Sequence, residues 1–241
     1  MKTRIAQAYP DRVEVRGRDL TGDLMGRVTF TDHFHLLLTG QEPTEEQRFF
    51  LDLLLVSIAE HGLMPTNVAA RMTFAADPDS LQGAVAAGIL GCGPVILGTA
   101  DECARLLAQN HGRDPLQVAR EIHAAGEKMP GFGHPVHTPV DPRAERILEL
   151  ADEHGASGPH TELARSLRGA VAEVWGKPLT MNVSMPIASV LLDLGFPASA
   201  VKAVPILART ASLLAHLAEE QEDAIGLGLA EAAERAVEYE R

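Results

Sequence analysis

Near its middle, this 241-residue chain reads Gly131-Phe-Gly-His-Pro-Val-His-Thr-Pro-Val-Asp-Pro-Arg143. Glycine and proline interrupt the stretch too often for a helix, so we predict a shaped loop. The loop ends in Asp141-Pro142, an N-cap residue followed by a proline, which is typical of the first helical position. His134 therefore lies on a loop that leads into a helix, with Arg143 in the first turn of that helix. Loops held by rigid elements often carry functional residues.

The composition is that of a folded, helical protein. Hydrophobic residues make up 46% of the chain and charged residues 22%, which supports a core and argues against disorder. Aromatic residues contribute only 4%, so alanine and leucine fill the interior, as in closely packed helices. The length fits one large domain or two small ones.

Charge and cysteine content argue against several classes of function. The formal net charge is −12 and the sequence has no basic stripe, which argues against nucleic acid as a partner. The two cysteines, Cys92 and Cys103, form neither a CxxC pair nor a disulfide framework. Residues 1–15 lack the apolar core of a signal peptide, and we expect no apolar run of membrane-spanning length. We therefore expect a cytoplasmic protein without a membrane partner.

Helix signals recur along almost the whole chain. Capping boxes are predicted at Thr44 and Thr99, and Asp-Pro pairs at 114–115 and 141–142 open two more helices. One predicted helix is rich in small residues, among them Gly88, which would let another helix approach closely. A single short strand is predicted at 13–16, so the fold class is all-α. The predicted helices cover residues 49–58, 80–90, 99–110, 114–128, 141–155, 161–175, 187–194, 199–220 and 231–238.

Four motifs together resemble the citrate synthase family. The first is Gly-Phe-Gly-His followed by Asp-Pro-Arg within 131–143. Residues 206–219, Ile-Leu-Ala-Arg-Thr-Ala-Ser-Leu-Leu-Ala-His-Leu-Ala-Glu, are similar to a late helix of that family. Lys177–Ser184 is similar to its K…NVD loop, and Ala59-Glu-His61 falls where the family has ADHE. The motifs follow the family's order over about residues 50–220, which makes the set specific.

The length and the opening residues 12–20 more narrowly resemble the short bacterial branch named citryl-CoA lyase. The resemblance implies a citrate-synthase-like helical fold with the active site in a cleft between two domains. The large domain would comprise residues 1–97 and 191–241, and the small domain residues 98–190. The resemblance also implies a homodimer or higher homo-oligomer. Its small-molecule partners would be a CoA thioester substrate and a di- or tricarboxylate, with no tightly bound cofactor.

Four residues are the main candidates for the site that the resemblance implies. His134 would exchange a proton with the carbonyl oxygen at the reacting carbon–carbon bond, since imidazole titrates near neutrality; otherwise it only hydrogen-bonds its own loop. Arg143 and Arg209 would bind carboxylates with their planar guanidinium groups. The alternative for Arg143 is an exposed side chain in the first turn of a helix, and the alternative for Arg209 is a structural salt bridge. His61 follows a helix, where it would either bind substrate or interact with the helix dipole.

Further residues complete the expected site. Asn182 and Ser184 are expected at the substrate, and Asn182 is also expected to order its loop through backbone hydrogen bonds. Lys177 would meet a CoA phosphate, although a loop lysine can equally be solvated. The residues expected to bind the CoA moiety are Gly131, Phe132, Gly133 and Lys177.

His137 follows His134 by three residues and raises the possibility of a metal site. Two histidines at this spacing are too few ligands, and no cysteine or carboxylate cluster accompanies them. The sequence therefore predicts no metal.

Two positions depart from the family pattern. The synthases carry an aspartate that removes the acetyl proton where this chain has Ser184, and a histidine that hydrogen-bonds the enolate where it has Ile96. A serine hydroxyl cannot replace a carboxylate base without an activator. The best single prediction remains a lyase or synthase that acts on an acyl-CoA, with citryl-CoA lyase as the named activity. The alternative is a catalytically silent relative that binds an acyl-CoA or di-acid as a regulator or partner.

Overall fold

The computed structural model describes residues 1–240, and helices dominate it. The all-α class is thereby confirmed, and the strand predicted at 13–16 is found as β2 in a small antiparallel meander. The helices are α1 (Phe30–Thr39), α2 (Glu45–Ala59), α3 (Pro65–Ala76), α4 (Leu81–Leu90), α5 (Thr99–Asn110), α6 (Pro115–Ala124), α7 (Pro142–Glu153), α8 (Pro159–Trp175), α9 (Ser184–Asp193), α10 (Ala203–Glu222) and α11 (Gly226–Arg235). The remaining elements are β1 (Ala6–Ala8), β2 (Val13–Val15), β3 (Arg18–Asp19), a π-helical turn at Leu20–Leu24 and a 3-10 turn at Ala198–Ala200.

Local sequence explains where most of these helices begin. Thr44 forms a reciprocal capping box with Gln47 at the start of α2, and the side chain of Asp141 caps α7. The capping box predicted at Thr99 is wrong: α5 begins there, but its N-cap is Gly98. The Thr99 hydroxyl instead donates to the carbonyl of Pro94, which ties the preceding loop to the helix.

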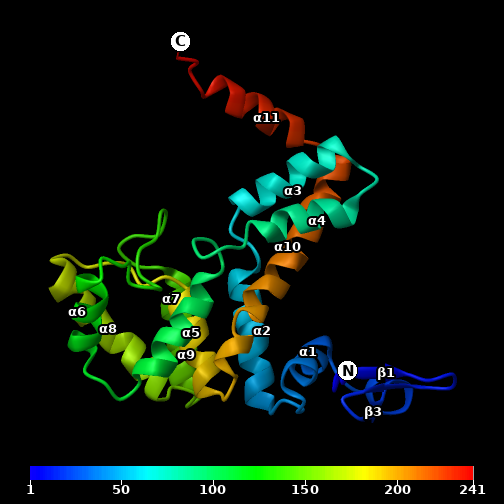
Figure 1. Ribbon diagram of the computed structural model, residues 1–241, viewed down its shortest axis with the longest axis horizontal. Coiled ribbons are helices and arrows are strands. Elements are labelled where there is room, and N and C mark those ends of the chain that lie inside the picture. Colours follow the sequence, from blue (N-terminus) through cyan, green and yellow to red (C-terminus); the bar gives the residue numbers. More distant parts are fainter. Residues whose placement is uncertain (241) are drawn as a thin grey trace.

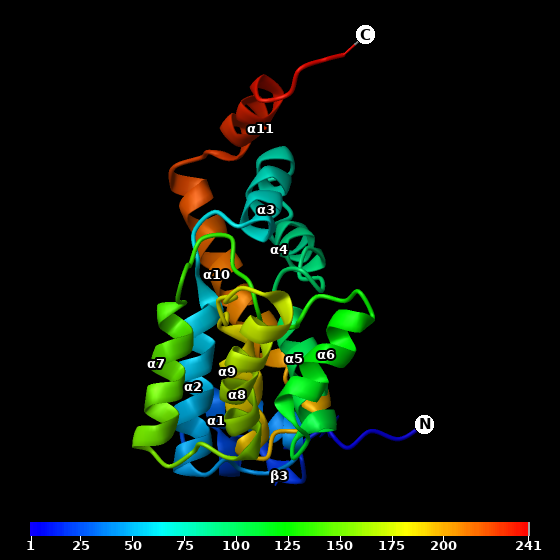
Figure 2. The same ribbon diagram turned by 90° about the vertical axis from the view of Figure 1, so that its left-hand side faces the viewer.

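Two hydrophobic cores are joined by the longest helix. The main core packs α2 against α5–α9 and the first turns of α10, while a smaller core lies between α3, α4 and the second half of α10. Figures 1 and 2 show α10 running from the body of the molecule to the α3–α4 pair, with α11 beyond it. The predicted boundaries between a large and a small domain, at residues 98 and 190, stay a prediction. The main core contains residues from both sides of the first boundary, because α2 packs against α5–α9.

One expectation about the chain's apolar runs needs correction. The stretch Ala198–Glu222, which includes α10, is long and apolar enough to cross a membrane by length and composition alone. The sequence prediction missed it because Lys202 and Arg209 interrupt the run. In this structure α10 packs against α2, α3 and α4, and Leu213 and Leu217 are fully buried there.

Close packing of α3, α4 and α10 depends on the absence of a side chain at Gly88. A Cβ atom there would lie 2.7 Å from the Leu213 side chain and 2.9 Å from the backbone oxygen of Thr66. The predicted close approach of another helix to this small-residue stretch is thus confirmed, and α3 and α10 are the helices that approach.

We expect Gly88→Ala to destabilise the protein, because the backbone contact cannot yield and overpacking costs about 1–3 kcal/mol. This loss should exceed the gain of ~1 kcal/mol that alanine brings to a helix. Gly169→Ala in α8 is the matched control, since its Cβ would meet no atom within 4 Å. Urea unfolding should show a lower free energy of unfolding for Gly88→Ala and a higher one for Gly169→Ala. Equal gains at both sites would contradict the packing described.

Candidate active site

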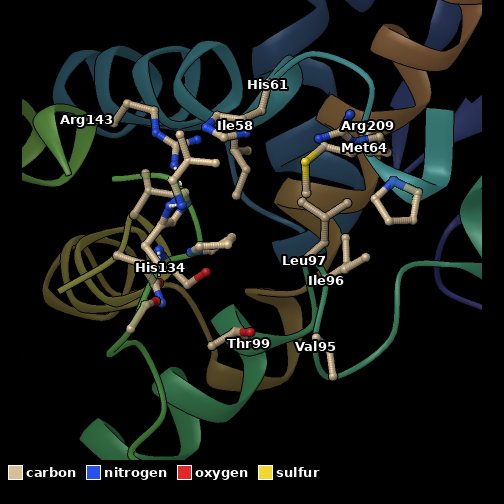
Figure 3. Close-up of a pocket in the computed structure, with 17 residues that line it drawn as sticks. Ile58, His61, Met64, Val95, Ile96, Leu97, Thr99, His134, Arg143 and Arg209 are labelled. Carbon is tan, nitrogen blue, oxygen red and sulfur yellow. Dashed lines mark hydrogen bonds between the residues drawn. The ribbon is translucent and has the colours of Figure 1, made fainter. Parts of the chain in front are cut away.

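Most of the predicted site residues line one pocket with a volume of about 410 Å³. They come from segments that are distant in sequence: the turn after α2, the loop before α7, the start of α9 and the middle of α10 (Figure 3). Most of the other lining residues are apolar. The predicted residues gathered here are His61, Gly133, His134, Arg143, Asn182, Ser184 and Arg209.

The loop that carries His134 is fixed by its contacts with the segment before α9. Gly131 and Gly133 have φ angles of 76° and 93°, which favour glycine, and a Cβ on Gly131 would lie 2.9 Å from Met185 Cβ. The Asn182 backbone N–H donates to the Gly131 carbonyl at 2.9 Å, and its side-chain amide donates to the Gly133 carbonyl at 3.0 Å. Asn182 thus makes the loop-ordering bonds that the sequence led us to expect.

The backbone of the loop determines which ring nitrogen of His134 carries the proton. Nδ1 accepts the N–H groups of Val136 at 3.1 Å and His137 at 2.8 Å. A neutral His134 must therefore hold its proton on Nε2. Burial lowers the pKa of His134, the neighbouring His137 lowers it further, and Asp141 acts in the opposite direction. The net shift is downward, so the ring is a neutral Nε2–H donor near neutral pH.

Arg143 is held by a buried carboxylate. Asp141 has no exposed surface and accepts from Arg143 at three atoms: the backbone N–H at 3.1 Å, Nε at 3.0 Å and Nη2 at 2.9 Å. Asp141 also accepts the backbone N–H of Val183 at 3.1 Å. Burial raises the pKa of Asp141, but the hydrogen bonds and charge of Arg143 outweigh burial and bring the pKa below its ordinary value. The guanidinium is thereby oriented at the pocket, with Nη2 3.4 Å from His134 Nε2.

Arg209 is buried in the pocket wall with part of its hydrogen-bonding capacity unused. Its exposed fraction is 2%, and Nη1 donates to Asn67 Oδ1 at 2.7 Å. Its Nε–H has no partner within residues 1–240. Burial lowers the pKa of Arg209, although arginine stays charged in proteins. A buried cation with an unpaired donor favours the binding of an anion.

A polar network connects Arg209 to the turn that carries His61. Asn67 and Ser212 both contact Arg209, and the Ser212 hydroxyl donates to the Glu60 carboxylate. The other Glu60 oxygen accepts the backbone N–H groups of His61 at 2.8 Å and Gly62 at 2.6 Å. Burial raises the pKa of Glu60, but the Ser212 and backbone hydrogen bonds lower it below its ordinary value. Glu60 therefore stays ionised and fixes the His61 turn.

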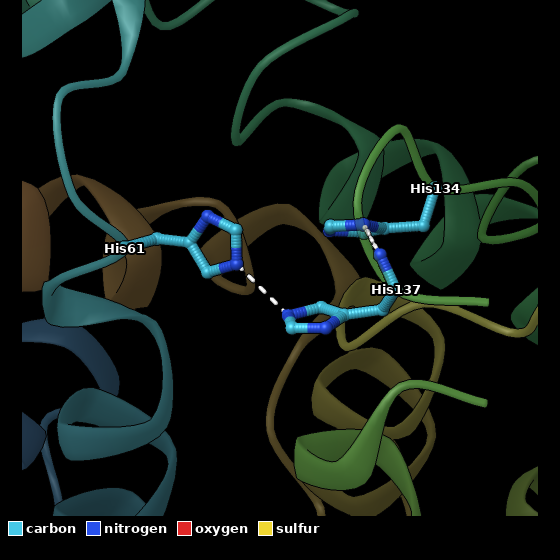
Figure 4. A group of neighbouring side chains, drawn as sticks. All are labelled: His61, His134 and His137. Carbon is cyan, nitrogen blue, oxygen red and sulfur yellow. Dashed lines mark hydrogen bonds between the residues drawn. The ribbon is translucent and has the colours of Figure 1, made fainter.

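His137 joins His61 and His134 in a cluster of three imidazoles (Figure 4). The Nε2 atoms of His61 and His137 lie 2.9 Å apart, and one ligand atom of each histidine lies within 4.8 Å of the others. A metal bound through His134 Nε2 would displace the proton there to Nδ1, which already accepts two backbone N–H groups. The Arg143 guanidinium beside the ring also repels a cation. The cluster therefore fits hydrogen bonding better than metal coordination.

The two departures from the family pattern also lie in this pocket. Ser184 lines it at the start of α9, and its backbone N–H donates to Asn182 Oδ1 at 3.1 Å. Ile96 reaches the pocket from the loop before α5, in which Leu97 has a φ angle of 64°, unusual for a residue other than glycine. None of the residues that line the pocket is acidic.

A second pocket, of about 810 Å³, lies beside the same loop. Gly131 and Phe132, which the sequence assigned to the CoA moiety, line this pocket, and Gly133 lines both pockets. Lys177 is exposed and lines neither pocket. It lies just after the C-terminal end of α8. The charged residues that line the second pocket are two cations, Arg105 and Lys128, and two carboxylates, Glu102 and Glu127.

Sequence reasoning missed three residues that support the site. Asp141 was predicted only as a helix cap, although its place two residues before Arg143 is a signal for an ion pair. His137 was considered only as a metal ligand. Glu60, adjacent to His61, gave no signal of its network, because Ser212 is 152 positions away in the chain.

Comparison with known proteins identifies the family. The family described as "Citrate synthase, C-terminal domain" matches residues 2–227. The chain belongs to the citrate synthase family. It is similar to the solved structure of citryl-CoA lyase from Hydrogenobacter thermophilus, with a TM-score of 0.90 and 30% identity over 100% of this chain and 94% of that one.

Two further matches are to larger proteins. A solved ATP citrate lyase from Methanothrix soehngenii, in complex with citrate and coenzyme A, has a TM-score of 0.80 at 20% identity, a likeness of fold, and covers 92% of this chain and 39% of that one. The curated citrate synthase of Haloferax volcanii is 29% identical over 197 residues, covering 79% of this chain and 51% of that protein. The chain thus spans about half the length of the curated relatives it matches.

The Asp141–Arg143 pair predicts a pH-dependent contribution to stability. Because the pKa of Asp141 is lower in the folded protein, its contribution is full above the unfolded value of about 3.9 and is lost as the pH falls through the folded value. Asp141→Asn should cost roughly 3–5 kcal/mol at pH 7, since it leaves Arg143 without its buried partner. Urea unfolding between pH 7 and pH 3 should show a difference that shrinks with acidity. A constant difference would contradict the ion-pair assignment.

Proposed function

We propose that this protein breaks or makes a carbon–carbon bond in an acyl-CoA, and that it cleaves citryl-CoA to acetyl-CoA and oxaloacetate. The observation that carries this proposal is the convergence of His61, His134, Arg143 and Arg209 on one pocket. Two cations and two neutral imidazoles suit a substrate with carboxylates and a reacting oxygen. The likeness to the citryl-CoA lyase of Hydrogenobacter thermophilus, over nearly the full length of both chains, supports the choice of substrate.

The proposed cleavage breaks the bond between the hydroxyl-bearing carbon and the methylene carbon of the thioester. The electron pair of that bond moves into the thioester to form an enolate, which takes a proton on carbon to give acetyl-CoA. The hydroxyl oxygen loses its proton and becomes the carbonyl oxygen of oxaloacetate. His134 would donate a hydrogen bond from Nε2–H to this oxygen and stabilise negative charge on it, while the hydroxyl proton passes to water, because Nε2 already carries a proton. Arg143 and Arg209 would hold the carboxylates on either side.

The second pocket is the place we propose for the CoA moiety. Gly131 and Phe132 would contact the pantetheine arm, and Lys128 and Arg105 would meet the phosphates, the role first predicted for Lys177. The protein's net charge of −12 gives an anionic ligand no general attraction, so these local cations matter.

We also propose that the chain forms a homodimer. The apolar groove between α4 and α10, lined by Leu81, Val85, Ile89 and Leu214, supports this. Leu90, at the end of α4, is 86% exposed and lies on the same helix. Burial of such side chains against a second copy would be favourable.

A second candidate function is binding of an acyl-CoA or di-acid without turnover. Ser184 and Ile96 favour it, because Ser184 is no carboxylate base for the acetyl proton and Ile96 has no group that can hydrogen-bond the enolate. In that case the carboxylate site would remain and the chain would act as a regulator or partner.

Turnover of citryl-CoA distinguishes the two. We expect the purified protein to release oxaloacetate, followed as NADH loss with malate dehydrogenase. His134→Gln should lower the rate by about 10²–10³, the usual range for loss of a positioned oxyanion donor. His111→Gln is the control, because His111 is exposed and outside both pockets. A wild-type rate no higher than that of His134→Gln would exclude the lyase.

Carboxylate binding tests the pocket without turnover. We expect oxaloacetate to bind in isothermal titration calorimetry, and Arg209→Met to weaken it by about 10–100-fold, since a charged hydrogen bond contributes about 1.5–3 kcal/mol. Arg105→Met, in the second pocket, should leave oxaloacetate binding unchanged and weaken CoA binding instead. Equal oxaloacetate affinity in wild type and Arg209→Met would show that Arg209 is only structural.

A further inference from the structure

His137 makes hydrogen bonds to both site histidines through different groups, and its ring also lies against the His134 ring, with the ring centroids 4.5 Å apart. Its backbone N–H donates to Nδ1 of His134 at 2.8 Å, and its ring Nε2 lies 2.9 Å from Nε2 of His61 (Figure 4). His137 does not line the main pocket, whereas His61 and His134 do. Any effect of His137 on a bound molecule must therefore act through these two rings.

The contact between His61 and His137 constrains where protons lie. Two nitrogens at hydrogen-bond distance require one donor and one acceptor, so only one of the two Nε2 atoms carries a proton. Burial lowers the pKa of His61, and the positive charge of Arg143 and the ring of His137 lower it further. Asp141 opposes these effects and Arg209 adds to them, so His61 is neutral near neutral pH. A neutral imidazole has a single N–H, on Nδ1 or on Nε2.

Only one of the two arrangements suits an anion site. If His61 donated to His137, its Nδ1 would present a lone pair, which repels a carboxylate. If His137 donates, Nδ1 of His61 carries the proton and becomes a donor. Nδ1 has no hydrogen-bond partner within residues 1–240, so it is the ring atom left to bind a ligand. The neighbouring Arg143 and Arg209 set the same preference for a negative ligand.

We propose that His137 is a positioning residue whose ring keeps His61 protonated on Nδ1, while its backbone N–H helps to keep His134 protonated on Nε2. Both histidines are then neutral donors that face the same substrate. This inference rests on the proposed function only in that the ligand is a carboxylate. It gives the His137 side chain a role beyond its place in the loop before α7. It also predicts a selective effect on the tautomers, because a side-chain substitution removes the hydrogen bond to His61 and leaves the backbone hydrogen bond to His134.

Long-range ¹H–¹⁵N NMR spectra of histidine-labelled protein measure both tautomers directly. The full chain is used, at pH 7, and the His61 and His134 signals are assigned with His61→Gln and His134→Gln. In the wild type we expect the Nδ1–H form at His61 and the Nε2–H form at His134. In His137→Phe the His61 signal should change to the Nε2–H form or a mixture, while His134 keeps its form. An Nε2–H tautomer at His61 in the wild type would overturn the proposal, whatever the variants do.

His137→Gln is the rescue variant, because its side-chain amide can still donate to Nε2 of His61 and should retain the Nδ1–H form. His111→Gln should change neither signal. An unchanged His134 signal in His137→Phe also shows that the loop is still folded. If His137→Phe leaves the His61 tautomer unchanged, His137 does not position that ring and the inference fails.

Binding measurements separate this inference from the proposed function. His137→Phe should weaken oxaloacetate binding by about tenfold, and His137→Gln should restore most of it. In the lyase assay the same loss should appear in kcat/KM more than in kcat. If the tautomers are as expected but no carboxylate binds to the wild type, the proposed function fails while the positioning role stands. If oxaloacetate binds equally to wild type and His137→Phe, the inference fails while the proposed function stands.

Discussion

The site depends on one fully buried carboxylate, that of Asp141. Asp141 caps α7, accepts three hydrogen bonds from Arg143 and accepts the backbone N–H of Val183 at the entrance to α9. A buried carboxylate is destabilising unless it is paired and hydrogen-bonded. Each contact that stabilises Asp141 also fixes the position of a part of the pocket. The His134 loop ends at Asp141, so its far end is fixed as well. Ion pairing, helix capping and loop geometry are therefore a single constraint, and the pocket has its shape before any ligand arrives.

Charge in the pocket runs against the charge of the whole molecule. The chain carries −12 overall, yet Arg143 and Arg209 face a pocket without an acidic lining residue. The acidic partners lie behind the arginines, Asp141 directly and Glu60 through Asn67 and Ser212. The same positive field and the burial keep His61 and His134 neutral, because a protonated ring would add to the repulsion. Neutral imidazoles donate from one nitrogen only, so specificity in this site depends on hydrogen-bond direction as much as on charge.

Short-range sequence signals predicted the parts of this site, and tertiary contacts determined how the parts meet. The Asp-Pro pair at 141–142 and the Thr44 capping box gave two helix starts correctly, because caps act within three residues. Helices α1 and α3 were not predicted. Met64 gives α3 no side-chain cap and proline alone opens it, whereas the capping box of Thr29 and Asp32 that opens α1 was overlooked. The contact of His61 with His137 spans 76 positions, and no local rule reveals it. Lys177 lines neither pocket for the same reason, because its place is set by where α8 ends, and its contact with a CoA phosphate stays a prediction.

Two groups that form the enolate in the synthases are replaced in this pocket. With Ser184 and Ile96 in place, nothing in the lining removes a proton from carbon, which condensation of acetyl-CoA requires as its first step. Cleavage makes the same enolate by breaking a carbon–carbon bond. For this step the site must bind the carboxylates and stabilise negative charge on the hydroxyl oxygen of the substrate. There the pocket is complete, with His134, His61 and both arginines. The enolate must still gain a proton on carbon, and because both directions pass through this enolate, the substitutions weaken cleavage and synthesis alike. What the substitutions leave in place is the fixed oxygen site, so recognition of the carboxylates and of the reacting oxygen depends on residues that this chain retains.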